Sequence, residues 1–470
     1  MIKISFRYLV DLVMLSRIQF SLNICFHYLY PPISIGLGLM MVIMEGMYLK
    51  AKDPIRKAKY KEMTSFWIKI FALTFALGVA TGLVQGFAFG TNWARYSRYV
   101  GDVFGGALAS EGIFAFFLES GFLGVLLFGW DRVGPKLHYF STICVALGAH
   151  FSAVWIIVAN SWMQTPAGHI IEQTPLGPRA IIVDFWAMVF NPSSMDRLAH
   201  TLIACWMTGA FMVISVSAYY LLRKKHLAIT RSMMKIALVT ALSTCILQLG
   251  SGDRSAKLVA KYQPAKLAAF EGNYVTQDYT PISVLGWVDA KNQKVHSLSI
   301  PGGLSFLTYS NFKQPVTGLD QIPREEWPNV AFVFQTYHLM ILMWGLMFSI
   351  SVLGAWFWYR GTLENKRWLL WSMIFSVGFP HIAQQAGWIS AEVGRQPWIV
   401  WKLLRTSDGV SASVSTGQLF GSITMFLMVY ILLFTLFLFL LNRKIKHGPE
   451  ETPTDDQIYQ DVYKLKNGQS

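Results

Sequence analysis

Charged residues are scarce in this chain of 470 residues, since Asp, Glu, Lys and Arg together make up only 14% of it. Soluble globular proteins carry about 25% charged residues. In their place 53% of the residues are hydrophobic, and apolar runs of about 20 residues recur, each long enough to cross a bilayer as a helix. The scarcity of charge therefore excludes an ordinary soluble domain and predicts an all-α polytopic membrane protein.

Cysteine is also rare, and its pattern excludes two further features. The four cysteines, Cys25, Cys144, Cys205 and Cys245, all lie in apolar segments. None belongs to a CxxC or CxxCH motif or has the spacing of metal ligands, so neither a disulfide framework nor covalent haem attachment is indicated. We interpret the four cysteines as packing residues.

Acidic residues are outnumbered, with 26 Asp and Glu against 40 Lys and Arg, which gives a net charge of +14. Such an excess is found in nucleic-acid-binding proteins, but here the basic residues do not form one domain. They gather in short segments between the apolar runs, as the positive-inside rule describes for cytoplasmic loops. The charge therefore predicts orientation in a membrane, with no nucleic-acid partner.

The apolar runs predict about nine transmembrane helices. They cover residues 18–47, 65–92, 104–129, 137–160, 198–222, 232–250, 330–359, 368–391 and 416–442. Basic clusters follow the first span at 50–61 and the fifth span at 223–231, and every second loop agrees with them. This alternation places the N-terminus outside and a C-terminal tail, residues 443–470, in the cytoplasm.

One connection is much longer than the others. Residues 251–329 form a polar stretch that contains Gly and Pro. A connection of this length in a compact protein more often carries a site than serves as a passive link. We therefore divide the chain into helices one to six at 1–250, this extracytoplasmic loop at 251–329, and helices seven to nine at 330–442.

Four side chains that can bind iron are expected in the outer half of the membrane. His27 lies a few residues into the first span, about 10 Å deep at 1.5 Å per residue. His200 opens the fifth span, Met340 lies inside the seventh, and Glu392 ends the eighth. Each residue alone has a structural explanation, such as a hydrogen bond between helices. Their convergence favours iron ligation, and a His/Met pair suits a haem that transfers electrons.

Two carboxylates form a second group in the third span. Glu111 and Glu119 are eight residues apart, so on an α-helix they lie within about 80° of each other. We expect them to face one interior channel, as in a proton relay that ascends from the cytoplasm. The alternative is a pair of protonated carboxyl groups that join helices.

Several long motifs follow one another along this chain. They are SRIQF from Ser16, EGIFAFFLES from Glu111, FGWDR from Phe128, WIIVANSWMQ from Trp155, QPAKLAAFE from Gln263, and GRQPW from Gly394. Together they resemble the motifs of the large subunit, subunit I, of the cytochrome bd-type quinol oxidases. The resemblance covers nearly the whole chain, and the motifs stand in the right order. The loop at 251–329 is similar to the shorter form of that family's quinol loop.

The resemblance implies one low-spin and two high-spin haems. His200 and Met340 match the axial ligands of a low-spin haem b. His27 and Glu392 match the ligands of a high-spin haem b and of a haem that is usually haem d but is a third haem b in some cases. Which of these two haems belongs to which residue stays open. The further cofactor-binding residues are Trp388, placed between haems, and Arg17, Gln19 and Arg395, which contact propionates.

The resemblance also implies the reaction. Lys266 and Glu271 match residues that bind and deprotonate quinol at the outer face, while Glu119, Glu111 and Ser152 match the route of cytoplasmic protons to the site where dioxygen becomes water. Such an enzyme charges the bacterial inner membrane without pumping protons. The implied partners are ubiquinol or menaquinol, dioxygen, a second membrane subunit, a small single-helix subunit and the lipid bilayer.

One alternative haem ligand and two alternative classes of protein depend on single features of the sequence. His338 lies two residues before Met340, where some members of the family have arginine, and it competes with Met340 as a ligand. A haem–copper oxidase needs an adjacent His-His pair, which this sequence lacks. A secondary transporter also places charged residues in its spans and often shows inverted repeats, but no internal repeat is found here.

Overall fold

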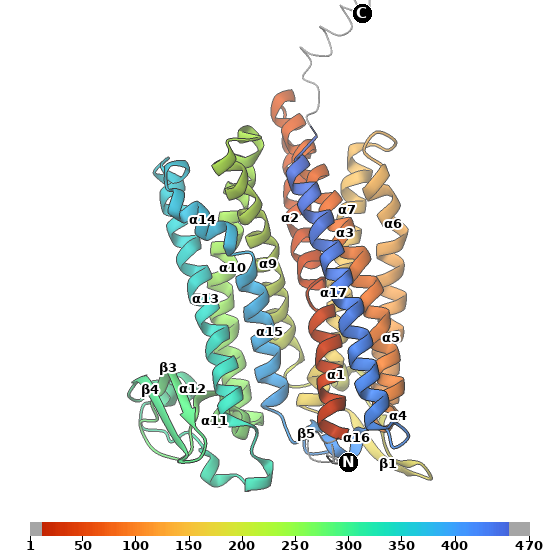
Figure 1. Cartoon of the computed structure of the whole chain (residues 1–470), viewed down its shortest axis with the longest axis vertical. Helices are drawn as coiled ribbons and strands as arrows, with labels where there is room; N and C mark the ends of the chain where they lie inside the picture. Colours follow the sequence, from red (N-terminus) through yellow and green to blue (C-terminus); the bar gives the residue numbers. More distant parts are fainter. Residues whose placement is uncertain (1–11, 451–470) are drawn as a thin grey trace, which may run out of the picture.

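The computed structural model describes residues 12–450, and helices dominate it (Figure 1). Within these residues, eight helical segments are long and apolar enough to cross a membrane. They are Leu12–Lys50 (α1 and α2), Pro54–Asn92 (α3), Gly101–Phe128 (α5, η2 and α6), Pro135–Gln164 (α7), Ser194–Arg223 (α9), Leu227–Tyr262 (α10), Arg324–Tyr359 (ending in α13, Val330–Tyr359) and Thr416–His447 (α17). The expected class, an all-α polytopic membrane protein, is confirmed.

The remaining expected range, 368–391, is divided between two shorter helices, α14 (Arg367–Phe375) and α15 (Gly378–Val393). Proline explains the break. Pro380 has no N–H to donate to the carbonyl of Ser376, and the N–H of Phe379 bonds that carbonyl instead, at 3.1 Å.

The first span is interrupted in the same way. Helix α1 (Leu12–His27) ends at His27, and α2 (Pro31–Lys50) begins with two prolines. Pro31 cannot donate to the carbonyl of His27, which accepts from the N–H of Tyr30 at 3.1 Å. The sequence therefore puts His27 at a turn inside the membrane segment.

The third span contains a π-helical turn, η2 (Gly112–Phe116), between α5 (Gly101–Glu111) and α6 (Phe117–Phe128). A π-turn accommodates an extra residue relative to an α-helix. The angle between Glu111 and Glu119 around the helix axis is therefore smaller than the expected value of about 80°.

The long helices stand side by side, and the other elements gather at one end of the bundle (Figure 1). These are the antiparallel hairpins β1 (His169–Thr174) with β2 (Gly177–Ile182) and β3 (Ile282–Asp289) with β4 (Lys294–Ile300), a short pair β5 (Trp398–Val400) with β6 (Leu404–Arg405), and helices α4 (Ala94–Tyr99), α8 (Phe185–Val189), α11 (Pro264–Glu271), α12 (Gly303–Tyr309) and α16 (Thr406–Gly409). The start of α1 lies at this end and the end of α17 at the other (Figure 1). Which end faces the cytoplasm stays a prediction.

Several helices extend beyond their expected ends. Helix α3 begins at Pro54, whereas the expected span begins at residue 65. Helix α10 continues to Tyr262, beyond the expected end at 250, so the first residues of the expected loop are helical. Helix α17 continues to His447, and residues 451–470 of the expected tail lie outside the described residues. In each case the added residues are mostly polar, so hydropathy does not predict them as part of the span.

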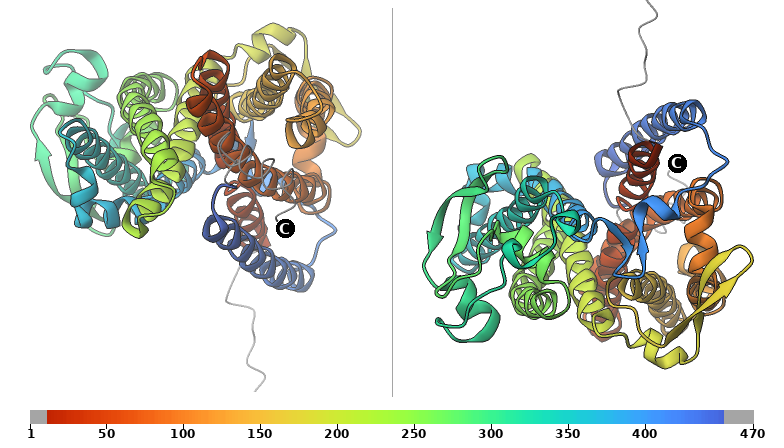
Figure 2. Two further views of the ribbon diagram at one scale, coloured as in Figure 1. Left: turned by 90° about the horizontal axis from the view of Figure 1, so that it is seen from above. Right: turned by 90° about the horizontal axis from the view of Figure 1, so that it is seen from below.

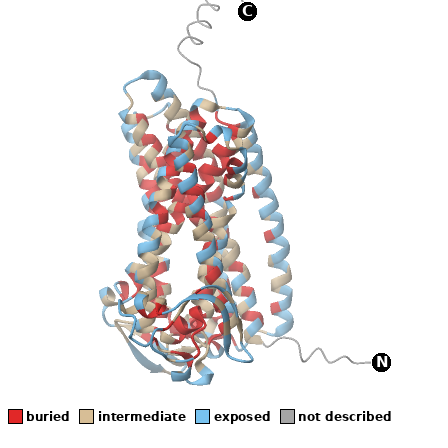
Figure 3. Cartoon of the chain, turned by 90° about the vertical axis from the view of Figure 1, so that its left-hand side faces the viewer, coloured by how far each residue is buried: buried red, intermediate tan, exposed pale blue. Residues whose placement is uncertain are grey.

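The bundle has two groups of helices that meet at α2 and α9. Seen from the ends, α9, α10 and α13 to α15 form one group, and α1 to α7 with α17 form the other (Figure 2). Gly36 of α2 and Gly209 of α9 let the two backbones touch: a Cβ added to Gly209 would lie 2.7 Å from the Cα of Gly36. Buried residues concentrate toward the C-terminal end of α17, and fewer lie in the half nearer the hairpins (Figure 3).

We expect Gly209→Ala to destabilise the protein, because overpacking of a close contact costs about 1–3 kcal/mol. Thermal unfolding of the purified protein should occur at a lower temperature. Gly86→Ala is the matched control, because a Cβ there meets nothing within 4 Å. An unchanged unfolding temperature in the Gly209→Ala variant would contradict the close packing of α2 on α9.

Candidate functional site

Glu392 lies near the end of α15 and is surrounded by hydrogen-bond donors. Its Oε1 accepts from Asn160 Nδ2 at 3.1 Å and from Gln164 Nε2 at 3.0 Å, both on α7. Its Oε2 forms an ion pair with Arg395 Nη2 at 2.5 Å, and Arg395 is only 2% exposed. The side chain of Glu392 is 32% exposed, but donors from α7 and the Arg395 guanidinium engage its carboxylate, so it belongs to a polar cluster at the end of α15.

Two further cations belong to this cluster. Arg197 of α9 donates to Asn160, and Lys266 of α11 donates to Gln164 Oε1 at 2.5 Å. Lys266 is buried, and burial together with the neighbouring guanidinium groups of Arg197 and Arg395 holds the pKa of its ammonium well below the usual range. Three basic side chains thus face one carboxylate, Glu392.

This cluster fits the propionates of a haem. Arg395 Nη1 and Arg197 Nε are buried and have no hydrogen-bond partner within residues 12–450. Buried cationic donors without acceptors are costly, and carboxylates are their natural partners. The excess of basic side chains points to the same ligand chemistry.

Arg17 and Gln19 are not brought into this cluster. Gln19 Nε2 bonds Ser422 Oγ of α17 at 3.1 Å, and its Oε1 is buried without a partner in the described chain. Arg17 makes no hydrogen bond or ion pair within residues 12–450. Their assignment to propionates stays a prediction.

Trp388 connects the cluster to the turn that carries His27. It lies one turn before Glu392 on α15, and the Arg197 guanidinium lies 5.5 Å from its ring centre. The ring of Tyr28 packs edge-on against Trp388, with centroids 5.7 Å apart. The residue after His27 is therefore in contact with the helix that carries Glu392.

The hydrogen bonds of His27 leave one ring nitrogen free for iron. His27 Nδ1 lies 3.0 Å from Thr81 Oγ1 of α3, and Thr81 donates its own proton to the carbonyl of Leu77 at 2.7 Å. Thr81 must then accept from His27, so the proton is on Nδ1 and Nε2 keeps its lone pair. Haem iron requires this arrangement of a histidine ligand.

His200 has the same tautomer for the same reason. Its Nδ1 lies 2.9 Å from Ser251 Oγ of α10, and Ser251 donates to the carbonyl of Gln248 at 3.1 Å. Gln248 Nε2 lies 2.9 Å from His200 Nε2 and 3.2 Å from His200 Nδ1, while Gln248 Oε1 is buried and has no partner in the described chain. Ligation of iron by His200 Nε2 would displace this amide.

Met340 and His338 point to different parts of the molecule. Met340 Sδ lies against Gly387 of α15, where a Cβ would be only 2.8 Å away. Both ring nitrogens of His338 lie 2.9 Å from backbone carbonyls, those of Phe334 and Ser283. His338 is thus engaged with its own helix and with β3, which favours Met340 as the ligand. Helices α9, α10, α13 and α15 contact each other in a ring, so Met340 and His200 belong to one four-helix unit.

Glu111 and Glu119 both contact α7. Ser152 Oγ donates to Glu111 Oε1 at 2.5 Å, and the side chain of Glu119 lies on Gly148, where a Cβ would collide with it. Gly148 and Ser152 are one helical turn apart on one face of α7. The two carboxylates therefore contact α7 at positions that are one turn apart.

Glu271 does not contact the Glu392 cluster. It ends α11, is 5% exposed, accepts weakly from the N–H of Ser283 at 3.4 Å, and lies beside the phenol of Tyr337. Burial raises the pKa of the Glu271 carboxyl to about 7. Helix α11 thus places Lys266 toward the cluster and Glu271 toward β3 and α13.

Several residues that complete these sites were not among the predicted ones. They are Thr81, Asn160, Gln164, Arg197, Gln248 and Ser251. Asn160 and Gln164 stand four residues apart in an apolar span, and Arg197 precedes His200 by about one turn. Helical spacing of polar residues was therefore an available signal for these three.

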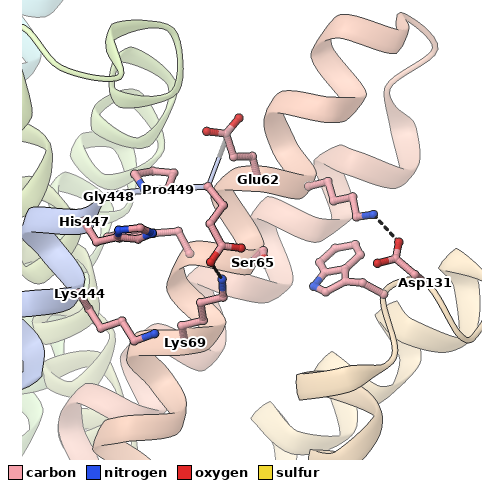
Figure 4. Close-up of a pocket in the computed structure, with 12 residues that line it drawn as sticks. Glu62, Ser65, Lys69, Asp131, Lys444, His447, Gly448 and Pro449 are labelled. Atoms are coloured by element: carbon pink, nitrogen blue, oxygen red, sulfur yellow. Dashed lines mark hydrogen bonds and ion pairs between the residues drawn. The ribbon is translucent and has the colours of Figure 1, made fainter. Parts of the chain in front are cut away.

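Two other observations bear on where a cofactor binds. In the described chain no group of three or more His, Cys, Asp or Glu side chains is placed to hold a metal ion; haem iron takes only one or two axial protein ligands. A cavity of about 240 Å³ lies near the C-terminal end of α17 (Figure 4). Its cations are partly paired, Lys61 with Asp131 at 2.9 Å and Lys69 with Glu450 at 2.5 Å, and none of the candidate ligands lines it.

Comparisons with known proteins agree over nearly the whole chain. Residues 15–449 match the family model of cytochrome bd terminal oxidase subunit I. The chain is 37% identical to cytochrome bd ubiquinol oxidase subunit 1 of Bacillus subtilis, over 96% of this chain and 98% of that protein. It is 34% identical to cytochrome bd-II ubiquinol oxidase subunit 1 of Escherichia coli, over 95% and 99%. The bd oxidase structure from Geobacillus thermodenitrificans superposes with a TM-score of 0.85 at 30% identity, covering 93% and 99%.

The pKa of Glu271 can be measured by infrared difference spectroscopy. Because burial favours the neutral form, the C=O band of the protonated acid should disappear with a midpoint near pH 7, against an ordinary value of 4.5. Between these values the folded protein holds the extra proton, so this group makes folding less favourable as the pH rises. The band should be absent in Glu271→Gln. A midpoint near 4.5 would contradict the buried position.

Proposed function

Because the chain belongs to the family of cytochrome bd terminal oxidase subunit I, we propose that it oxidises quinol at the hairpin end of the bundle and reduces dioxygen to water. The protein is a multi-pass protein of the bacterial inner membrane and a subunit of a quinol oxidase. One observation carries the proposal: the buried network joins Lys266 of the predicted quinol loop to the predicted haem ligand Glu392 through Gln164.

Three haems are part of this proposal. His200 and Met340 would hold a low-spin haem b, and His27 and Glu392 two high-spin haems, one haem b and the other haem d or a third haem b. When bound, these groups supply electron transfer and the reduction of dioxygen. Support comes from the Nε2 of His27, from the Ser251 hydroxyl that orients the His200 ring, and from the unpaired donors of Arg395 and Arg197.

Quinol oxidation needs a base for the hydroxyl protons. Glu271 is suited to this role, because a carboxyl with a pKa of about 7 both accepts and releases a proton near neutral pH. Lys266 lies on the same short helix and would orient the quinol head group. Protons from quinol then leave on the outer side, where α11 lies in the predicted orientation.

Protons for water formation would come from the other side. Glu119, buried against α7, would pass them to Glu111, whose carboxyl is bonded to Ser152 Oγ at 2.5 Å. Two quinols together give up four electrons and four protons, and one dioxygen takes up four of each in forming two molecules of water. Because release and uptake occur on opposite sides, the reaction would charge the membrane without a pump.

A second membrane subunit and a small single-helix subunit are the proposed protein partners, with ubiquinol or menaquinol as the electron donor. The third span leaves room for a neighbour, because only 17% of its most apolar window is buried within this chain. Its exposed side chains, such as Phe114 and Phe117, are apolar. A partner helix would cover this face.

Spectra of the purified complex test the assignment of His200 and Met340 as ligands of the low-spin haem. We expect His200→Ala and Met340→Leu to abolish the low-spin haem b band in the reduced-minus-oxidised spectrum, because each removes an axial ligand, and to lower quinol-driven oxygen uptake at least about 100-fold. His338→Ala is the matched control and should keep the band. A low-spin band that survives in His200→Ala would remove His200 from this role.

A further inference from the structure

The turn after His27 leaves a backbone carbonyl without a helical partner. In a continuous helix the N–H of Leu29 would bond the carbonyl of Cys25, but here it bonds Phe26 at 3.3 Å. Unpaired backbone groups are expensive in a membrane, where no water replaces the lost bond. The prolines that position His27 therefore create a need for a side-chain donor.

Gln385 of α15 supplies that donor. Its Nε2 donates to the carbonyl of Cys25 at 2.8 Å. The bond joins α15 to the last turn of α1, two residues before His27. It is a contact between segments far apart in the sequence.

The neighbouring Gln384 bonds the other side of the turn. Its Oε1 accepts from the Tyr28 hydroxyl at 3.2 Å, and its Nε2 donates to Thr208 Oγ1 of α9 at 2.6 Å. Thr208 donates its own proton to the carbonyl of Ala204 at 2.9 Å, so it must accept from Gln384. This chain of donors fixes the orientation of the amide and leaves its oxygen for Tyr28.

We propose that Gln384 and Gln385 are positioning residues that hold the turn of His27 against α15. The same helix carries Trp388, which packs on Tyr28, and Glu392 one turn further. The two glutamines thereby set the separation between His27 and Glu392. This inference rests on the proposed function, because the separation matters for catalysis only if both residues hold haems.

Removal of the amide should move the turn while leaving the other haem site intact. In Gln385→Leu the Cys25 carbonyl loses its partner, and the turn would shift to find another. The hydrogen bonds of His200 run to Ser251 and Gln248 of α10 and not to this turn, and Met340 packs on Gly387. The effect should therefore appear at the high-spin haem of His27 and not at the low-spin haem.

The test is electron paramagnetic resonance of the oxidised, purified complex, with the low-spin signal as internal standard. We expect Gln385→Leu to lower the ratio of high-spin to low-spin signal at least twofold. Gln385→Glu should restore it, because a carboxyl in the membrane stays protonated and donates to the same carbonyl. Gln335→Leu is the matched control: its amide also donates to a carbonyl, that of Gly286 at 3.0 Å, but far along the chain from this turn.

An unchanged ratio in Gln385→Leu would overturn the proposal, and so would an equal loss of both signals, which would indicate general misfolding. Tyr28→Phe provides a second variant, because it keeps the ring on Trp388 and removes only the hydroxyl bonded to Gln384. It should shift the ratio in the same direction, and no shift would count against the proposal. Failure of the proposed function is distinguishable, because the unmodified protein would then show no haem signals.

Discussion

The ion pair between Glu392 and Arg395 is the interaction on which the rest of the site depends. A carboxylate at membrane depth must be matched by donors, or it costs several kcal/mol. Asn160 and Gln164 supply donors from α7, and Gln164 in turn accepts from Lys266 of α11. One charge at the end of α15 therefore fixes a transmembrane helix, the predicted quinol loop and Arg395 relative to each other.

Interruptions in the helices accompany the functional candidates. His27 ends α1 before two prolines, Glu111 immediately precedes the π-turn, and α15 begins after the break at Ser376. Irregular backbone is tolerated at membrane depth only where protein groups satisfy it, and π-turns often mark functional sites. The cost of each break is offset by local bonds, such as that from Gln385 to the Cys25 carbonyl. The breaks place side chains where a straight helix would not.

The fold class was predictable because hydropathy depends only on composition along the chain. Residues of the site such as Glu392 and Lys266 were predictable from their motifs. Hydropathy could not show the break at Ser376, because the apolar run continues through it, nor the polar helical extension of α10 to Tyr262. Thr81 and Ser251 were missed because their roles come from contacts with His27 and His200 that are distant in sequence, and a lone Thr or Ser in a span usually bonds its own helix.

The central claim is that Glu392 and His27 lie at the positions of two irons on either side of Trp388. Cryo-electron microscopy of the haem-loaded complex, with the irons located in the density map, tests this most directly. The account predicts one iron within coordination distance of the Glu392 carboxylate, one at His27 Nε2, and a third between His200 and Met340. A density map in which Glu392 bonds only Asn160, Gln164 and Arg395, with no iron beside its carboxylate, would contradict the account.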